Sequence, residues 1–221
     1  MVKTWSDDNP KAALMSRKRT MIVDAALRAF LESGYAESSV NRIAADAGVS
    51  IKTLYRHFES KDDLFSAVMQ AACSPPAAQS ADASEPAEPG EPTWFSEPPA
   101  VALPMAGSDY LRHALSKEQL DLYRVVTRDA PRFPELARRY RDEVTGTRDA
   151  LFTSYLDRWL PVTGWEVRDK YGAAATFAAL LKARLFDDAL LGLKSPSEED
   201  IAGCAADAAV QMLTLMETGR L

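Results

Sequence analysis

The chain has 221 residues, of which 47% are hydrophobic and 26% are charged, an ordinary globular composition that suits one or two domains with a substantial core. No apolar run approaches the ~20 residues that a membrane-spanning helix needs. The N-terminus lacks the apolar core of a signal peptide, so we expect a cytoplasmic protein. Glycine is scarce, alanine is abundant and strand-like runs are absent, which predicts an all-α fold.

The formal net charge of −6 argues at first against a nucleic-acid partner. The charge is unevenly distributed, however. Up to Cys73 there are 10 Lys and Arg against 9 Asp and Glu, a net charge of +1, and the remainder carries −7. Because attraction to phosphate is screened beyond ~8–10 Å, a basic cluster on one face is enough for binding. Cys73 and Cys204 are interpreted as buried free thiols, with a disulfide or redox pair as the alternative.

Residues 1–16 are predicted to form a flexible arm that is basic where it joins the first helix, at Arg17, Lys18 and Arg19. Two interpretations are open. The arm is either a solvated terminus or a segment that touches phosphates or a minor groove.

The next segment, 20–33, has the apolar spacing of a helix, and Gly34 is expected to end it. This helix is predicted to hold the following two helices at a fixed crossing angle. Tyr35 is interpreted as a plug of the core, with a phosphate-donating hydroxyl as the alternative.

Between Ser38 and Leu64 the pattern predicts a helix, a tight turn, a second helix and the start of a third. Ser39 and Ser50 stand where N-caps belong, and Gly48 is the usual residue for a left-handed helix end. Leu54 and Phe58 are expected to face the core. This is the helix-turn-helix layout, in which the second helix enters a major groove of DNA.

Family resemblance begins at these residues. The run AxxAGVSIKTLYRHFESKDDLF, preceded by IVDAALRAFLESGYAESSV, resembles the DNA-binding signature of the TetR/AcrR family of bacterial repressors over 20–65. A shorter run, APRFPELARRY, resembles the C-terminal domain of an AefR-like subgroup. A signature of this length is specific, whereas any two capped helices imitate a lone helix-turn-helix.

The resemblance implies which side chains meet DNA. Ser39 is expected on phosphate, and Asn41 suits adenine, whose N6 and N7 match its acceptor and donor. Ile51 is expected on a thymine methyl and Lys52 on guanine, whereas Tyr55 matches a family position that bonds phosphate. The predicted DNA contacts are Ser39, Asn41, Arg42, Ser50, Ile51, Lys52, Thr53, Tyr55, Arg56, His57 and Lys61.

Alternatives stand beside several of these assignments. Ile51 packs inward in one of them, and Arg56 is a solvated surface residue in another. A metal role for His57 is disfavoured because no Cys or His lies three or four residues away. No metal site and no cofactor are predicted.

Two consecutive prolines after Ser74 stop the fourth helix, expected over 61–72. The predicted domains are the arm 1–16, a helix-turn-helix DNA-binding domain 17–73, a Pro/Ala/Glu-rich linker 74–106 and a helical ligand-binding and dimerisation domain 107–221. Relatives usually continue a long fourth helix, so the linker departs from the family pattern. Trp94 and Phe95 are apolar islands expected to dock on the C-terminal domain.

The C-terminal half is predicted to form helices over 116–129, from 134 to about 159, and over 167–193, and a last helix that starts near Ser197. In relatives the last two helices pair with their copies as a four-helix interface. We therefore expect a homodimer, with a monomer core as the alternative for these helices. The predicted interface residues are Ala175, Ala179, Ile201, Ala205, Ala208, Met212 and Leu215.

Aromatic residues spread over these helices are interpreted as the lining of a chamber for a small apolar or aromatic effector, with ordinary core as the alternative. The predicted lining is Met105, His113, Tyr123, Phe152, Tyr155, Trp159 and Phe177.

No Gly-rich phosphate loop, metal pair or catalytic constellation is found, so an enzyme is not predicted and no catalytic residue is assigned. The predicted function is a transcriptional repressor that a ligand releases from a palindromic operator. A ligand-blind repressor or an architectural DNA-binding protein is the alternative, which the broken fourth helix makes less remote.

Overall fold

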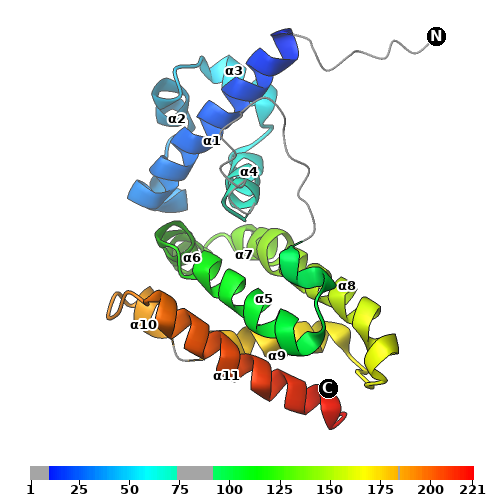
Figure 1. The fold of residues 1–221 in the computed structure, drawn as a ribbon. Helices are drawn as coiled ribbons and strands as arrows, with labels where there is room; N and C mark the ends of the chain where they lie inside the picture. The colour runs from blue at the N-terminus through cyan, green and yellow to red at the C-terminus, as the bar shows by residue number, and fades with distance from the viewer. Residues whose placement is uncertain (1–9, 74–91, 184) are drawn as a thin grey trace, which may run out of the picture. The chain divides into compact units, whose positions relative to one another are not determined.

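The computed structural model describes residues 10–73, 92–183 and 185–221. Helices joined by short turns fill these ranges and no strand occurs in them, which confirms the all-α fold class (Figure 1). In chain order the helices are α1 Pro10–Glu37, α2 Val40–Asp46, α3 Ile51–His57, α4 Lys61–Cys73, η1 Thr93–Ser96, α5 Pro99–Ala114, α6 Lys117–Asp129, α7 Pro134–Tyr140, η2 Arg141–Thr145, α8 Gly146–Thr163, α9 Lys170–Lys182, α10 Phe186–Leu190 and α11 Glu198–Glu217.

The described chain divides into two compact units. Unit 1 holds 10–73 together with 121–144, and unit 2 holds 92–120 together with the residues from 145 onward. This division differs from the predicted domain 107–221, because 121–144 clusters with the N-terminal helices. The reason is hydrophobic: Leu122 and Leu136 are fully buried in the core of unit 1.

Helix α1 is longer than the predicted segment 20–33. It begins at Pro10 and runs to Glu37, with a break at Gly34, whose φ of 79° lies in the left-handed region that favours glycine. The predicted arm 1–16 is therefore helical from Pro10 onward, and 1–9 lies outside the described residues.

Unit 1 is held together by an aromatic and aliphatic core. Tyr35 is 5% exposed, and its ring packs edge-on against Phe65 at 5.3 Å and Phe133 at 5.2 Å. Its hydroxyl donates to Asp62 of α4. Tyr35 is thus the core plug that the sequence predicted, and it joins the end of α1 to α4 and to the segment before α7.

Unit 2 begins earlier than the predicted linker allowed. Trp94 and Phe95 are buried in its core, which confirms that they dock there, and α5 starts at Pro99. The linker prediction is therefore wrong for 93–106, and 74–91 lies outside the described residues. Helix α5 packs closely on α11, because a Cβ on Gly107 would lie 3.1 Å from that of Ala205.

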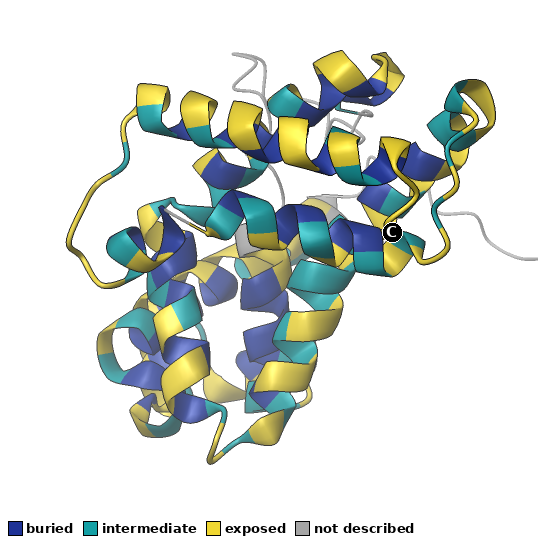
Figure 2. Ribbon diagram, turned by 90° about the horizontal axis from the view of Figure 1, so that it is seen from below, coloured by how far each residue is buried: buried dark blue, intermediate teal, exposed yellow. Residues whose placement is uncertain are grey.

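The last helices differ from the prediction in their breaks. Helix α8 runs through Pro161 and ends at Gly164, and the predicted helix 167–193 is divided into α9 and α10. Helix α11 starts with a capping box in which Ser197 and Asp200 satisfy each other's backbone N–H groups. Buried residues lie along one side of the helices (Figure 2), and none of the described helices is long and apolar enough to cross a membrane.

Candidate nucleic-acid interface

Helices α2 and α3 are joined by a turn whose geometry follows from the sequence. Gly48 has a φ of 66°, and nothing lies within 4 Å of where its Cβ would stand, so the turn needs a left-handed residue but no close packing. Ser50 caps α3, and its hydroxyl accepts the Thr53 N–H at 3.1 Å. The turn therefore fixes the orientation of α3 relative to α2.

One side of α3 is core and the other is free surface. Leu54 and Phe58 are each 1% exposed, as predicted, whereas Ile51 is 38% and Tyr55 is 51% exposed. The interpretation in which Ile51 packs inward is therefore wrong. A helix that presents a large apolar side chain and a tyrosine to solvent, above a well-packed base, has the layout of a recognition helix.

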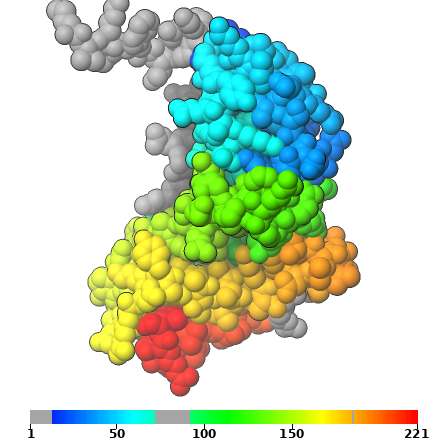
Figure 3. Space-filling view, turned by 180° about the vertical axis from the view of Figure 1, so that it is seen from behind, coloured from blue at the N-terminus to red at the C-terminus, as the bar shows by residue number. Residues whose placement is uncertain are grey.

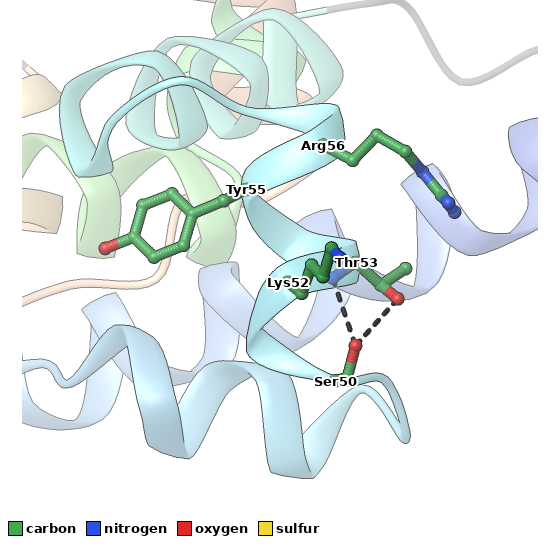
Figure 4. A pocket seen from close by; sticks show the side chains of 5 residues that line it. All are labelled: Ser50, Lys52, Thr53, Tyr55 and Arg56. Carbon is green, nitrogen blue, oxygen red and sulfur yellow. Dashed lines mark hydrogen bonds between the residues drawn. The ribbon is translucent and has the colours of Figure 1, made fainter.

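The outer surface of α3 forms a shallow hollow of about 560 Å³, lined by Ser50, Lys52, Thr53, Tyr55 and Arg56. Tyr55 and Arg56 leave the helix on opposite sides, and Ser50 and Thr53 are hydrogen-bonded to each other at its start (Figure 4). Seen as a solid surface, the α2–α3 segment in cyan lies at the outside of its unit (Figure 3).

The predicted contact residues at the start of α2 are all exposed: Ser39, Asn41 and Arg42. Ser39 stands at the N-cap, but its side chain makes no cap hydrogen bond. Arg42 is different, because its guanidinium lies 3.1 Å from Glu32 and 3.7 Å from Asp46. A phosphate would have to compete with these two carboxylates for Arg42.

His57, at the end of α3, is surrounded by cations. Its Nε2 is buried and has no hydrogen-bond partner among the described residues. Burial lowers the pKa of His57, and the positive charges of Arg56, Arg19 and Lys18 lower it further. The imidazole is therefore held neutral in a positive field.

Lys61 is half-buried rather than displayed. Its ammonium donates to the Ser38 carbonyl at 2.7 Å and the Ala36 carbonyl at 3.4 Å, and it lies 4.6 Å from the centre of the Tyr35 ring. Burial lowers the pKa of Lys61, and Asp129, Asp62 and Glu37 oppose that shift. In this geometry Lys61 fixes the segment that leads into α2.

Sequence reasoning missed the contact that α6 makes with the end of α1. The Asp129 carboxylate accepts the Tyr35 N–H at 2.6 Å and pairs with Arg128 at 3.1 Å. Burial alone would raise the pKa of Asp129, but these bonds hold it below its usual value. A Cβ on Gly34 would lie 1.4 Å from the Arg128 guanidinium. The GlyTyr pair was the only signal of this contact.

The predicted effector-binding residues fall into separate groups. Phe152, Tyr155 and Phe177 share one aromatic cluster with Trp94 and Phe95, and the Phe152 and Phe177 rings stack at 5.3 Å. Trp159 joins this cluster, and its indole N–H is buried without a hydrogen-bond partner among the described residues.

The other three residues lie apart from that cluster in different ways. Met105 is 38% exposed on α5, and burial alone lowers the pKa of His113 on the same helix. Tyr123 belongs to unit 1, where it packs against Tyr140 at 5.7 Å, so it does not line the unit 2 cluster.

The predicted dimer residues also need correction. The stripe on α11 faces α5 and α9 within the same chain, and its members are between 0% and 6% exposed. Four of these residues belong to the core of unit 2: Ile201, Ala205, Ala208 and Met212. The small alanine side chains let α5 approach α11 closely. Leu215 is half-buried, whereas Ala175 and Ala179 on α9 are exposed.

Comparisons with known proteins agree with this architecture. Residues 22–68 match the family described as bacterial regulatory proteins, tetR family, and 102–215 match the AefR-like transcriptional repressor, C-terminal domain. The fatty acid metabolism regulator protein of Bacillus subtilis is 43% identical over 47 residues, which are 21% of this chain and 24% of that protein.

A second curated relative, the regulator AcrR of Shigella flexneri, is 42% identical over 52 residues, which are 24% of each chain. These matches span about a quarter of the relatives' length. The families and relatives are transcriptional regulators, not enzymes.

Solved structures extend the likeness to most of the chain. The flavonoid-responsive regulator FrrA is 28% identical with a TM-score of 0.70, over 90% of this chain and 96% of that one. A TetR-family regulator from Mesorhizobium loti is 23% identical with a TM-score of 0.69, over 91% and 97%. A further one, from Pseudomonas syringae, has 25% identity and a TM-score of 0.61, over 90% and 96%.

Proposed function

The chain belongs to the TetR family of DNA-binding transcriptional regulators, and from that premise we propose that it is a homodimeric repressor which a small aromatic molecule releases from a palindromic operator. The observation that carries the DNA-binding part is the outward face of α3, where Ile51, Lys52 and Tyr55 are exposed above a buried Leu54. A side-chain set of this kind fits a major groove.

Within that interface we assign different roles to different residues. Asn41 and Lys52 read base edges, because both are exposed and neither has a partner among the described residues. Ser39 and Tyr55 bond phosphates and fix the register without reading sequence. Ser50, Thr53 and Lys61 are bonded to neighbouring groups and act mainly by holding α2 and α3 in place.

The second copy is expected to cover the exposed faces of α9 and α11. Ala175 and Ala179 lie on the outer face of α9, and Val210 on α11 is 64% exposed. Family members act as dimers. Pairing through these small apolar residues would place two reading helices about 34 Å apart, one turn of DNA, and such a protein recognises a palindrome.

The effector is proposed to be a flat aromatic molecule that binds beside the Phe152–Phe177 cluster. The buried Trp159 N–H offers a donor without a partner, and a hydroxylated ring would supply the acceptor. The neighbour FrrA is named for its response to flavonoids, which favours this class over an aliphatic one. A regulator that binds the chromosome in a bacterium works in the cytoplasm.

The proposed division of labour is tested by gel shifts on operator and scrambled duplexes. Asn41→Ala and Lys52→Ala should each lower discrimination at particular base pairs by about 1–3 kcal/mol. Tyr55→Phe should instead weaken binding to every duplex equally. Equal behaviour of all three variants on all duplexes would refute the assignment.

Effector release is tested separately, by a thermal-shift panel of flavonoids and simpler phenols against the operator-free protein. Stabilisation together with loss of operator binding supports the proposal. No stabilisation by any aromatic compound would favour the ligand-blind repressor, and broad footprints without a palindrome would favour the architectural alternative. The consecutive prolines after Ser74, from which the sequence predicts a broken fourth helix, keep these alternatives in view.

A further inference from the structure

The start of α1 lies beside α3 and is fixed to it (Figure 1). Arg19 donates to the His57 carbonyl at 3.5 Å, and its guanidinium lies 4.5 Å from the centre of the Phe58 ring. From α3, Arg56 reaches back to the Met15 sulfur at 3.8 Å. These contacts tie the first turns of α1, of which 10–16 belong to the predicted flexible arm, to the second turn of α3.

Several cations on the first turns of α1 and on α3 lack an ion-pair partner among the residues that the structure describes. Arg17, Lys18 and Arg56 form no ion pair with any described carboxylate. Elsewhere in the chain Arg112, Arg138 and Arg148 each have one.

Burial lowers the pKa of His57, and the positive charges of Arg56, Arg19 and Lys18 lower it further, which is consistent with the contacts of Arg19 and Arg56 around the end of α3. A cluster of unpaired cations is destabilised by its own repulsion and is stabilised by a bound polyanion.

The directions of Arg56 and Tyr55 indicate which part of a DNA duplex these cations would contact. Arg56 leaves α3 on the side opposite to Tyr55 and points towards α1 (Figure 4). A helix seated in a major groove has a sugar–phosphate strand on each side of it, since the groove is only about 12 Å wide. If Tyr55 meets one strand, the cations beside Arg56 face the other.

We propose that the first turns of α1 form a second phosphate-binding surface, in which Arg17 and Lys18 together with Arg56 bind the DNA strand that flanks α3 on the side away from Tyr55. The inference rests on the proposed DNA-binding function and adds a surface to it. Because these side chains stand on a helix that is fixed to α3, less chain entropy is lost on binding than a flexible arm would lose.

The test is the salt dependence of binding by the full chain. Arg17→Ala/Lys18→Ala removes two contacts from each chain, so the slope of log K against log salt should fall by about 1.8 for each bound chain. Affinity should fall by the same factor on operator and scrambled duplexes, because phosphate contacts carry no sequence information. Alanine favours helix at both positions, which circular dichroism would verify.

Two controls distinguish the loss of charge at Arg17 and Lys18 from a general loss of net charge and from a folding defect. Arg168→Ala/Arg220→Ala removes the same charge from exposed positions of unit 2 and should leave the slope unchanged. The swap Arg17→Lys/Lys18→Arg keeps both charges and should also leave the salt slope unchanged. A slope in Arg17→Ala/Lys18→Ala equal to that of the wild type would overturn the inference, and so would an equal loss in the charge-keeping swap.

Failure of the proposed function looks different. In that case the wild-type chain itself would bind no duplex at low ionic strength. If the wild type binds a palindrome, and Asn41→Ala relaxes its preference while the α1 variant keeps the full salt slope, only the second surface is refuted.

Discussion

Helices α3 and α11 both bury an apolar stripe, and the comparison between them shows where a partner is to be found. On α3 the stripe of Leu54 packs into unit 1, and the opposite face carries Lys52 and Tyr55. On α11 the stripe that includes Met212 packs into unit 2, and the opposite face carries Val210. In both helices the regular stripe is the chain's own core. The partner, DNA or a second copy, is indicated by the chemistry of the outer face.

The largest expected effect tests this distinction on α11. Met212 is 0% exposed, so Met212→Ala should lower the free energy of unfolding by about 2–5 kcal/mol through a cavity. Val210, which is 64% exposed, should tolerate Val210→Asp within about 0.5 kcal/mol in the monomer, yet the charge should weaken association of the copies.

Urea unfolding and sedimentation over a range of protein concentrations measure the two quantities. The comparison fails if Met212→Ala leaves unfolding unchanged but abolishes the dimer, because the stripe would then be the interface.

A second test concerns two glycines of unit 1: Gly34 at the break in α1, and Gly48 in the turn between α2 and α3. Gly34 and Gly48 both have positive φ, but only Gly34 is crowded, by Arg128. Alanine costs about 1–2 kcal/mol of backbone strain at Gly48. Gly34→Ala should cost more, because φ 79° and ψ 174° define a backbone region that is essentially restricted to glycine, and because the Arg128–Asp129 pair must move at a cost of about 1 kcal/mol.

Thermal unfolding of the two variants measures the difference, and gel shifts measure its effect on binding. Equal costs at the two positions would show that α6 does not hold the end of α1.

Replacing Lys61 should have a smaller effect on stability, and the salt dependence of DNA binding shows whether its ammonium contacts DNA. Lys61→Met removes the donor to Ser38 and Ala36 while keeping the aliphatic stem, and should cost about 1.5 kcal/mol of stability. Affinity should fall on all duplexes alike, and the salt slope should stay unchanged. A slope lower by about 0.9 would show instead that the ammonium contacts a phosphate directly.

The smallest effect is a pH dependence at His57. In the free chain its pKa lies below 6.5, because of burial and of Arg56, Arg19 and Lys18. Phosphates that offset these cations should raise the pKa of His57, so the complex binds more protons than the free chain, and affinity should rise as pH falls below 6.5.

The effect of His57 on folding stability has the opposite pH dependence to its effect on DNA binding. The unfolded chain, with the higher pKa, takes up the proton first, so this contribution to stability is lost as pH falls below 6.5. Fluorescence anisotropy between about pH 5.5 and 8 measures the binding effect, and His57→Gln is the control. An unchanged pH profile in His57→Gln would mean that another group is responsible.

The sequence predicted the short-range features of unit 1 well. The cap at Ser50, the turn at Gly48 and the buried Leu54 follow from local rules that act within a few residues, whereas Ser39 stands at the N-cap position without the predicted side-chain hydrogen bond. The resemblance named the family, and the matches to the two regulator families confirm it.

The errors arose where a long-range partner decides the outcome. An apolar stripe such as that of Ala205 does not reveal whether it faces α5 or another copy of the chain. Nothing local shows that Arg42 meets Glu32, ten positions earlier, or that Lys61 reaches the Ser38 carbonyl. The short helix Thr93–Ser96 was not predicted, because prolines and acidic residues surround Trp94 and Phe95 in the sequence.

The most direct test of the central claim is to select genomic fragments with the full-length protein and footprint the bound sites. The account predicts a short palindrome, with half-sites about 34 Å apart and two chains bound to each site. It is contradicted if the chain stays monomeric on a single asymmetric site, or if it retains no fragment at low ionic strength.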